Sequence, residues 1–425
     1  MTEFLDHPLR YPLANELHAR PFPALSAPCR AAFLAVKRLD HASMRDREAD
    51  RAHLIQLLDR FGADHPKPGA THWFGRIGRH SLKWENHTEF VTYTIFEDGV
   101  MGEPFDPRAF EVFPADWLAS APGRRITSAL IRVEAVPDER IAAEVADWFV
   151  PESLALSRVL DGSAVVVGDF RIDAGGHMRF AVFPTPDCGQ RRIGRIVQRL
   201  CEIETYKSMS MLGLARSREM GPSLREIDAR LGELTTRMAG ENSAPETTLK
   251  SLLAVSSEIE RLAADAAFRF GATKAYAALV DQRIGVLRED RFGGRQTFAE
   301  FMMRRYDPSM RTVAATERQL QALSDRAIRA GDLLRTQVDV ERSAQNQALL
   351  ESMDRRSDLA LRLQRTVEGL SVVAISYYAV NLAFYALWPL IEGTGLSKTG
   401  AMAVLTPLVV LFVWAVVRRI RKRLD

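Results

Sequence analysis

The chain has 425 residues, of which 47% are hydrophobic and 26% are charged, so it is long enough for two or three folded domains and is neither disordered nor collagen-like. Its 57 Lys and Arg residues nearly balance its 54 Asp and Glu residues, for a formal net charge of +3. This balance excludes a basic nucleic-acid-binding surface spread over the whole chain. Cys29, Cys188 and Cys201 form no CxxC pair, which excludes a disulfide framework and a thiolate zinc ribbon.

The N-terminal part predicts an arm followed by a mixed head. Residues 1–28 hold five prolines and predict an extended arm. Residues 29–188 alternate strand and helix patterns, which predicts an α+β head with a mixed sheet. We expect strands at 31–38, 71–77, 81–85, 89–96, 126–133, 163–173 and 177–183, and helices at 42–61, 108–120 and 138–150. The turn Ala174-Gly175-Gly176 predicts a β-hairpin between the last two strands.

From residue 189 onward the chain is rich in good helix formers. Residues 189–306 predict a helical section, with one helix interrupted at Gly221-Pro222, another from Pro245 to about Asp290, and a short one at 297–306. Residues 307–368 predict a long stalk helix that continues into the hydrophobic C-terminal part, since no proline lies between Pro308 and Trp388. The alternative is two or three ordinary helices separated by turns.

Two uncharged segments near the C-terminus predict a membrane hairpin. Residues 369–391 and 400–417 are 23 and 18 residues long, and about 20 apolar residues cross the hydrocarbon core. The link at 392–399 has only eight residues, so the two helices must be antiparallel. The alternative is a pair of buried core helices.

Flanking charges predict the orientation of this hairpin. The link carries one basic residue, Lys398, whereas the tail at 418–425 is strongly basic. By the positive-inside rule both ends of the chain lie in the cytoplasm, and the first residues show no apolar core of a signal peptide. The basic side chains that set the topology, and that are suited to binding anionic lipid, are Arg418, Arg419, Arg421, Lys422 and Arg423.

Three stretches carry a family resemblance. HPLRYPLANELHARPFP (7–23), THWFGRI (71–77) and TVEGLSVVAISYY (366–378) resemble a bacterial family of uncharacterised membrane-anchored proteins, and the resemblance covers nearly the whole chain. It implies a location in the bacterial inner membrane. The family brings no established activity, so no catalytic residue is carried over.

The order of predicted parts also resembles CorA-type divalent-cation channels. An α/β head, a helical hairpin, a long stalk helix, two C-terminal spans and a basic tail are common to both. The resemblance implies a homo-oligomer, a pentamer in that family, with a divalent cation as permeant or regulatory ion. The CorA-type channels have a Gly-Met-Asn motif at the outer end of the first span. This sequence has no equivalent there, and the nearest match is Ala379-Val380-Asn381 inside the span.

A polar stripe within the first span is the candidate pore lining. Ser371, Tyr378, Asn381 and Tyr385 follow spacings of 7, 3 and 4, which place them on one helical face. Polar groups at this depth are costly unless paired or hydrated. In an oligomer they line a wet pathway; alternatively, they bond to the second span or to a neighbouring subunit and fix packing.

Two carboxylates flank the first span. Glu368 and Glu392, together with Asp358, form candidate rings at the pore mouths of an oligomer, where they attract cations. Taken singly, each is an ordinary charge near a helix end.

No recognised catalytic or cofactor motif occurs. GxSxG, GxxxxGK[ST] and GxGxxG are absent, and no histidine pair has metal-ligand spacing. His65, His72, His80 and His87 are spaced 7, 8 and 7 residues apart, so a regulatory metal site is a minor alternative to ordinary sheet and turn positions. We therefore expect no enzyme activity and no bound cofactor.

Three functions remain open from the sequence. The first is a CorA-like homo-oligomeric channel or transporter for divalent cations. The second is a membrane-tethered scaffold or regulatory protein, in which the hairpin is only an anchor and the head binds a cytoplasmic partner. The third, a tethered enzyme, has no motif to support it.

Overall fold

The computed structural model describes residues 5–16, 22–39, 46–238, 245–391 and 397–424. The chain divides into two compact units. We call Met1–Glu241 with Lys250–Ala330 the head, and Asn242–Leu249 with Gly331–Asp425 the hairpin unit.

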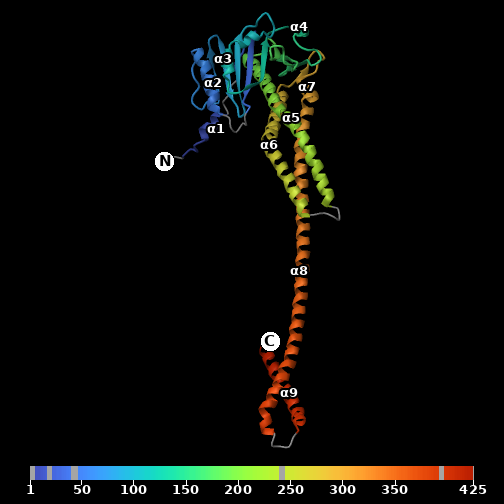
Figure 1. The fold of residues 1–425 in the computed structure, drawn as a ribbon. Coiled ribbons are helices and arrows are strands. Elements are labelled where there is room, and N and C mark those ends of the chain that lie inside the picture. Colours follow the sequence, from blue (N-terminus) through green and yellow to red (C-terminus); the bar gives the residue numbers. More distant parts are fainter. Residues whose placement is uncertain (1–4, 17–21, 40–45, 239–244, 392–396, 425) are drawn as a thin grey trace. The chain divides into compact units, whose positions relative to one another are not determined.

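Among the described residues, the head contains a nine-stranded mixed sheet (Figure 1) with the strand order β2-β3-β4-β1-β5-β8-β7-β6-β9. Neighbouring strands are antiparallel except β5 and β8, which are parallel. The prediction of an α+β head with a mixed sheet is therefore confirmed. The strands are β1 (Cys29–Lys37), β2 (His72–Ile77), β3 (His80–Asn86), β4 (Phe90–Asp98), β5 (Arg124–Val133), β6 (Ala155–Val159), β7 (Ala164–Gly168), β8 (Met178–Pro184) and β9 (Asp290–Arg291).

Helices cover both faces of the sheet. Successive side chains of a strand point to opposite faces, and in β1 Phe33 packs in the core that includes α5 (Gln190–Met238) while Leu34 packs in the core that includes α2 (Arg47–Arg60). Both faces being buried explains why β1 is apolar without alternation. The first face is also covered by α6 (Pro245–Gly285) and α7 (Phe298–Arg305), and the second by η2 (Pro107–Phe110), α3 (Ala115–Ala119) and α4 (Asp138–Glu144).

Most predicted strands are confirmed within about two residues, and three predictions of extent are wrong. The strand expected at 163–173 ends at Gly168, because the buried Asp169 carboxylate accepts the Arg171 N–H at 3.1 Å and Phe170 turns the chain at a φ of 53°. The helix expected at 108–120 is two short helices, η2 and α3, and the one expected at 138–150 ends at Glu144.

Two predictions based on proline are also wrong. The arm expected to be extended contains helix α1 (Arg10–Glu16), whose Pro12 lies in the first turn, where a missing N–H costs no helical hydrogen bond. Helix α5 continues through Gly221-Pro222 without a break. The buried Met220 and Leu224 on either side hold the helix against its neighbours, and this packing offsets the cost of the proline.

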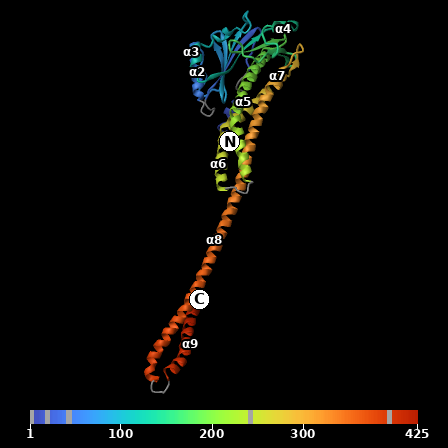
Figure 2. The ribbon, with the colours of Figure 1, turned by 45° about the vertical axis from the view of Figure 1, so that its right-hand side comes forward.

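Helix α8 (Asp307–Ile391) is one continuous helix of 85 residues, so the alternative of several shorter helices is not found. Within the head its first turns lie beside α5 and α6 in both views (Figures 1 and 2), and Val313, Leu320 and Leu323 are buried there.

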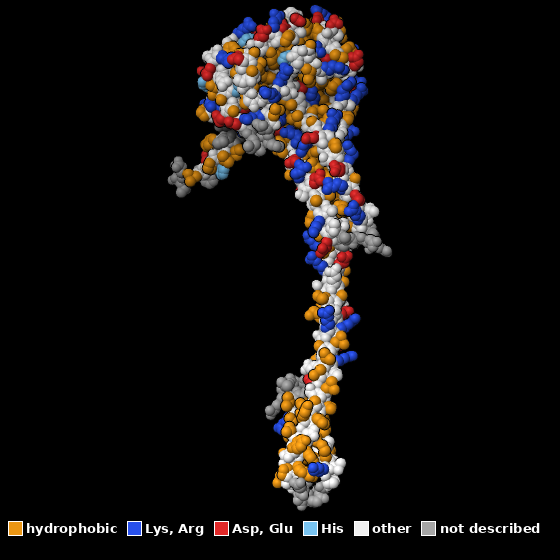
Figure 3. Space-filling model, in the orientation of Figure 1, with side chains coloured by type: hydrophobic (Ala, Val, Ile, Leu, Met, Phe, Trp, Pro, Cys, Tyr) orange, Lys and Arg blue, Asp and Glu red, His pale blue; other side chains and the backbone are white. Residues whose placement is uncertain are grey.

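The hairpin unit contains the rest of α8 and helix α9 (Lys398–Leu424). Both are long and apolar enough to cross a membrane, and only 11% of each hydrophobic window is buried, which is unlike a core helix. Figure 3 shows the hydrophobic side chains gathered on this pair of helices. Helix α9 begins inside the link predicted at 392–399; residues 392–396 lie outside the described part of the chain.

Candidate functional site

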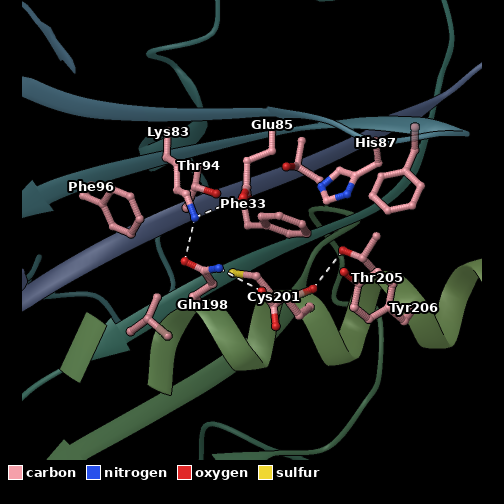
Figure 4. Close-up of a pocket in the computed structure, with 14 residues that line it drawn as sticks. Phe33, Lys83, Glu85, His87, Thr94, Phe96, Gln198, Cys201, Thr205 and Tyr206 are labelled. Atoms are coloured by element: carbon pink, nitrogen blue, oxygen red, sulfur yellow. Dashed lines mark hydrogen bonds and ion pairs between the residues drawn. The ribbon is translucent and has the colours of Figure 1, made fainter. Parts of the chain in front are cut away.

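A pocket lies in the head between the sheet and helix α5. Strands β1, β3 and β4 supply one wall and α5 the other, and the labelled side chains point toward one another (Figure 4). Its cavity volume is about 20 Å³, which is room for a single water molecule, because its own side chains nearly fill it. Its lining residues are Phe33, Lys83, Glu85, His87, Phe90, Thr92, Thr94, Phe96, Val197, Gln198, Cys201, Glu202, Thr205 and Tyr206. We call it the inner pocket.

The alternation of β3 places the charged residues of the inner pocket. Leu82 and Trp84 point into the core on the α2 side, and Lys83 and Glu85 therefore point toward α5. Lys83 is only 4% exposed, and a buried ammonium is stable only when it is paired.

A chain of polar contacts supplies that pairing and joins the sheet to two helices. The Lys83 ammonium donates to Oε1 of Gln198 at 2.6 Å and lies 3.2 Å from a Glu85 oxygen. The Gln198 amide donates to Glu202 at 2.8 Å, and Arg283 of α6 donates to the same Glu202 carboxylate. The two cations are balanced by two carboxylates, so the inner pocket is polar without a net charge.

A wider cavity adjoins the inner pocket. The two linings have His87, Phe90 and Tyr206 in common. We call the wider cavity the vestibule; it has a cavity volume of about 430 Å³. Its lining residues are Arg47, Thr71, Asn86, His87, Thr88, Phe90, Tyr206, Tyr276 and Leu279.

Four rings from three parts of the fold meet in the vestibule. Tyr206 of α5 and Tyr276 of α6 stack with centroids 5.8 Å apart, and His87 stacks on Phe90 at 4.4 Å. Phe90 also meets both tyrosines, at 6.4 and 6.1 Å. Burial, followed by the neighbouring Glu89 carboxylate, raises the pKa of Tyr276 above its ordinary value, so its hydroxyl stays protonated.

The vestibule chemistry suits recognition of a flat ligand with a negative charge. Aromatic faces bind planar rings by stacking, and the half-buried His87 and Tyr276 are the more accessible rings here. Arg47 carries the formal charge among the lining residues, and Thr71 and Thr88 offer hydroxyl groups. Cys201 is a poor nucleophile, because burial raises the pKa of its thiol.

The histidines considered for a metal site do not converge. His72 and His80 lie on β2 and β3, and His65 and His87 lie outside the strands and helices. Within the described residues, no group of three or more His, Cys, Asp or Glu side chains is arranged to hold a metal ion. His65 instead contacts Asp59 at 2.6 Å.

The predicted polar stripe lies on α8 in the hairpin unit. Tyr378 and Tyr385 are 67% and 75% exposed and Ser371 is exposed, whereas Asn381 is half-buried and lines a gap between α8 and α9. Ser371 and Asn381 donate to backbone carbonyls one turn earlier in the same helix, at 2.8 and 2.9 Å.

The flanking charges are partly described. Glu368 is exposed and accepts a hydrogen bond from Gln364 at 3.1 Å, while Glu392 lies outside the described residues. Arg418 and Arg419 are exposed, and Arg418 lies over the Trp414 ring at 4.9 Å. Helix α9 continues through Arg421, Lys422 and Arg423.

Sequence reasoning missed both the inner pocket and the vestibule. The alternation of Ser81, Lys83 and Glu85 with the apolar Leu82 and Trp84 was the available signal, but on its own it is typical of a strand face open to water. Only the packing of α5 and α6 on that face turns these residues into a pocket lining.

The structure combines an α+β domain that contains a pocket with two helices long and apolar enough to cross a membrane. The chain belongs to the protein family of unknown function DUF3422, which it matches over residues 5–424. No curated protein matches it. No solved structure matches it either.

Proposed function

We propose that this protein is a membrane-anchored regulatory protein whose head binds a small, planar, anionic molecule. The observation that carries this proposal is the vestibule, where four aromatic rings and Arg47 line a cavity of about 430 Å³ that adjoins a buried, charge-balanced inner pocket.

In this proposal the hairpin holds the head at the cytoplasmic face of a bacterial inner membrane. Two apolar helices and the basic residues after the second span support a two-span anchor with both ends in the cytoplasm. The exposed Arg418 and Arg419 then contact anionic lipid headgroups.

The ligand class is tested with matched probes on the full chain in mild detergent. Adenosine monophosphate contains a planar base and a charge, adenosine the base alone, and ribose 5-phosphate the charge alone. We expect the nucleotide to raise the Tm of the head the most, in a saturable way, because only a ligand-bound native state gains stability by mass action.

Substitutions separate ring binding from charge binding. Tyr276→Leu removes a stacking wall and is expected to abolish both the nucleotide and the adenosine shift. Arg47→Gln is expected to reduce the nucleotide shift to that of adenosine. Phe268→Ala, an exposed ring on the same helix and outside the vestibule, is the matched control. No shift with any of the three probes, or a nucleotide shift that Arg47→Gln leaves unchanged, contradicts the proposed ligand class.

A second candidate function is a homo-oligomeric divalent-cation channel of CorA-like shape. It is favoured by Tyr378 and Tyr385, which a single chain leaves 67% and 75% exposed on a helix that is apolar enough to cross a membrane. Reconstitution in liposomes and flux of Mg²⁺, Zn²⁺ and Na⁺ test it. Replacing the hairpin with an unrelated two-span anchor abolishes flux in a channel and leaves ligand binding intact in an anchored regulator.

A further inference from the structure

One stretch of α8 in the hairpin unit packs against no other described part of the chain, apart from the exposed ion pair of Arg342 with Glu246 of α6. All 33 residues from 339 to 371 are exposed, including Leu363 and Leu370 at 66% and 67%. Most of the stability of a helix in a protein comes from the packing of an apolar face. A helix of this length with exposed leucines therefore lacks the contacts that ordinarily hold it.

Five of the large apolar residues of this stretch follow a coiled-coil repeat, whereas Val340, Leu350, Leu359 and Leu361 lie off it. Alternating steps of four and three residues are the mark of a helix face that packs along another helix. We call the residues at these steps the seam: Leu349, Met353, Arg356, Ala360, Leu363, Val367 and Leu370. Arg356 is its only charged member, and residues 339–371 contain six Asp or Glu and five Arg residues, so copies of this stretch do not repel one another by net charge.

The same steps continue into the hydrophobic part of α8, at Ala374, Tyr377 and Asn381. Beside them lies a gap between α8 and α9 with a volume of about 360 Å³. Ser376 lines this gap, is only 6% exposed, and its hydroxyl has no hydrogen-bond partner among the described residues. In hydrocarbon an unpaired hydroxyl is costly, because no water is present to satisfy it.

We propose that the seam and the gap beside Ser376 form an interface with a second copy of this chain, arranged in parallel. Copies of one membrane protein insert with the same topology, so each seam residue lies at the depth of its counterpart. Ser376 is four residues from the middle of the 369–391 span, about 6 Å along the helix. Lipid headgroups begin about 15 Å from the bilayer centre, whereas Tyr377 of a second copy lies within one residue of its depth and has a side chain long enough to bond it.

The interface is separate from the proposed ligand site in the head, so either proposal can fail alone. The interface is tested on the full chain in native membranes by comparing two single cysteine variants. The native Cys29, Cys188 and Cys201 are buried. Leu363→Cys places a thiol in the seam, and Leu361→Cys places one two residues away, off the seam and 53% exposed.

Oxidation is expected to crosslink Leu363→Cys at least tenfold more than Leu361→Cys, because thiols on a shared seam approach within disulfide range. Equal crosslinking of the two variants, or none in either, overturns the proposal.

Mass measurement of the detergent-purified protein is the second arm. We expect an oligomer in the native chain, a monomer in the double variant Leu363→Asp with Val367→Asp, and an unchanged oligomer in Leu361→Asp. The Tm of the head serves as the folding control for each variant. A monomeric native chain overturns the proposal and leaves α8 to a different protein partner.

Discussion

The head and residues 339–371 of α8 differ in where the contacts that stabilise them lie. In the head, charged groups are buried and paired: Glu89 is 3% exposed and bonded to Arg269, and Lys83 is held by Gln198 and Glu85. In residues 339–371 every side chain is exposed. The stability of the head is therefore set within the chain, and the stability of this stretch depends on what lies outside it.

The largest effect is expected from breaking a buried ion pair of the head. Arg269→Met leaves the Glu89 carboxylate buried without its cation, which costs about 3–5 kcal/mol of unfolding free energy for pairs of this kind. Denaturant unfolding of the full chain, followed by tryptophan fluorescence, measures it.

The double variant Arg269→Met with Glu89→Gln is the control, since it removes the stranded charge. We expect it to recover at least half of the loss. An Arg269→Met variant as stable as the native chain means that this pair is hydrated, and the contrast between the two regions is then weaker than its burial indicates.

The second largest effect on the free energy of unfolding is expected where the N-terminal arm contacts helix α5. A Cβ at Gly194 on α5 lies 1.7 Å from the backbone oxygen of Pro23, so Gly194→Ala forces the arm off the helix. We expect a loss of about 2–3 kcal/mol, as for other overpacked sites. Gly232→Ala, on the same helix with nothing within 4 Å, is the control and is expected to gain about 0.5–1 kcal/mol. Equal effects of the two substitutions mean that the arm does not rest on α5.

The same comparison shows which elements of the fold can be predicted from the sequence. The apolar run of β1 and the proline-free stretch of α8 were enough to predict both elements, because each is decided by local pattern. Strand β9, with only two residues, pairs with β6 more than a hundred positions away, and no local pattern records such a pairing.

The site was harder to predict than the fold for a related reason. The vestibule joins Arg47, Phe90, Tyr206 and Tyr276, which no motif connects. Their meeting depends on how α5 and α6 cross the sheet, and that depends on side-chain packing over the whole head. In the hairpin unit, by contrast, composition alone predicts the hydrophobic segments. Whether their polar residues are hydrogen-bonded depends on the chains that pack beside them.

The third effect separates the two regions by pH. Burial lowers the pKa of His53 and of His177 below the ordinary 6.5, and His53 is held neutral between the Tyr93 hydroxyl and the Trp117 carbonyl, at 3.1 and 2.9 Å. Above pH 6.5 these rings are neutral in both the folded and unfolded states. As the pH falls below 6.5, the unfolded chain binds protons at these histidines more readily than the folded head does, so the free energy of unfolding decreases.

We therefore expect the Tm of the head to fall between pH 7.5 and pH 5.5, and His53→Gln to flatten that fall while lowering the Tm at pH 7.5. All nine histidines precede residue 178, so the helical signal of the hairpin unit is expected to be constant over the same range. A Tm independent of pH in the native chain contradicts the neutral, buried state of His53.

The smallest effect is expected from the ion pair between Arg342 of α8 and Glu246 of α6. Its atoms are 3.2 Å apart, and its side chains are 67% and 66% exposed. Exposed pairs contribute little, because water screens them and two long side chains lose freedom to form them. Arg342→Ala is expected to change the unfolding free energy by less than about 0.5 kcal/mol. A loss comparable to that of Arg269→Met would mean that this pair is covered in the assembled protein, and it would place a neighbouring chain beside Arg342 as well as along the seam.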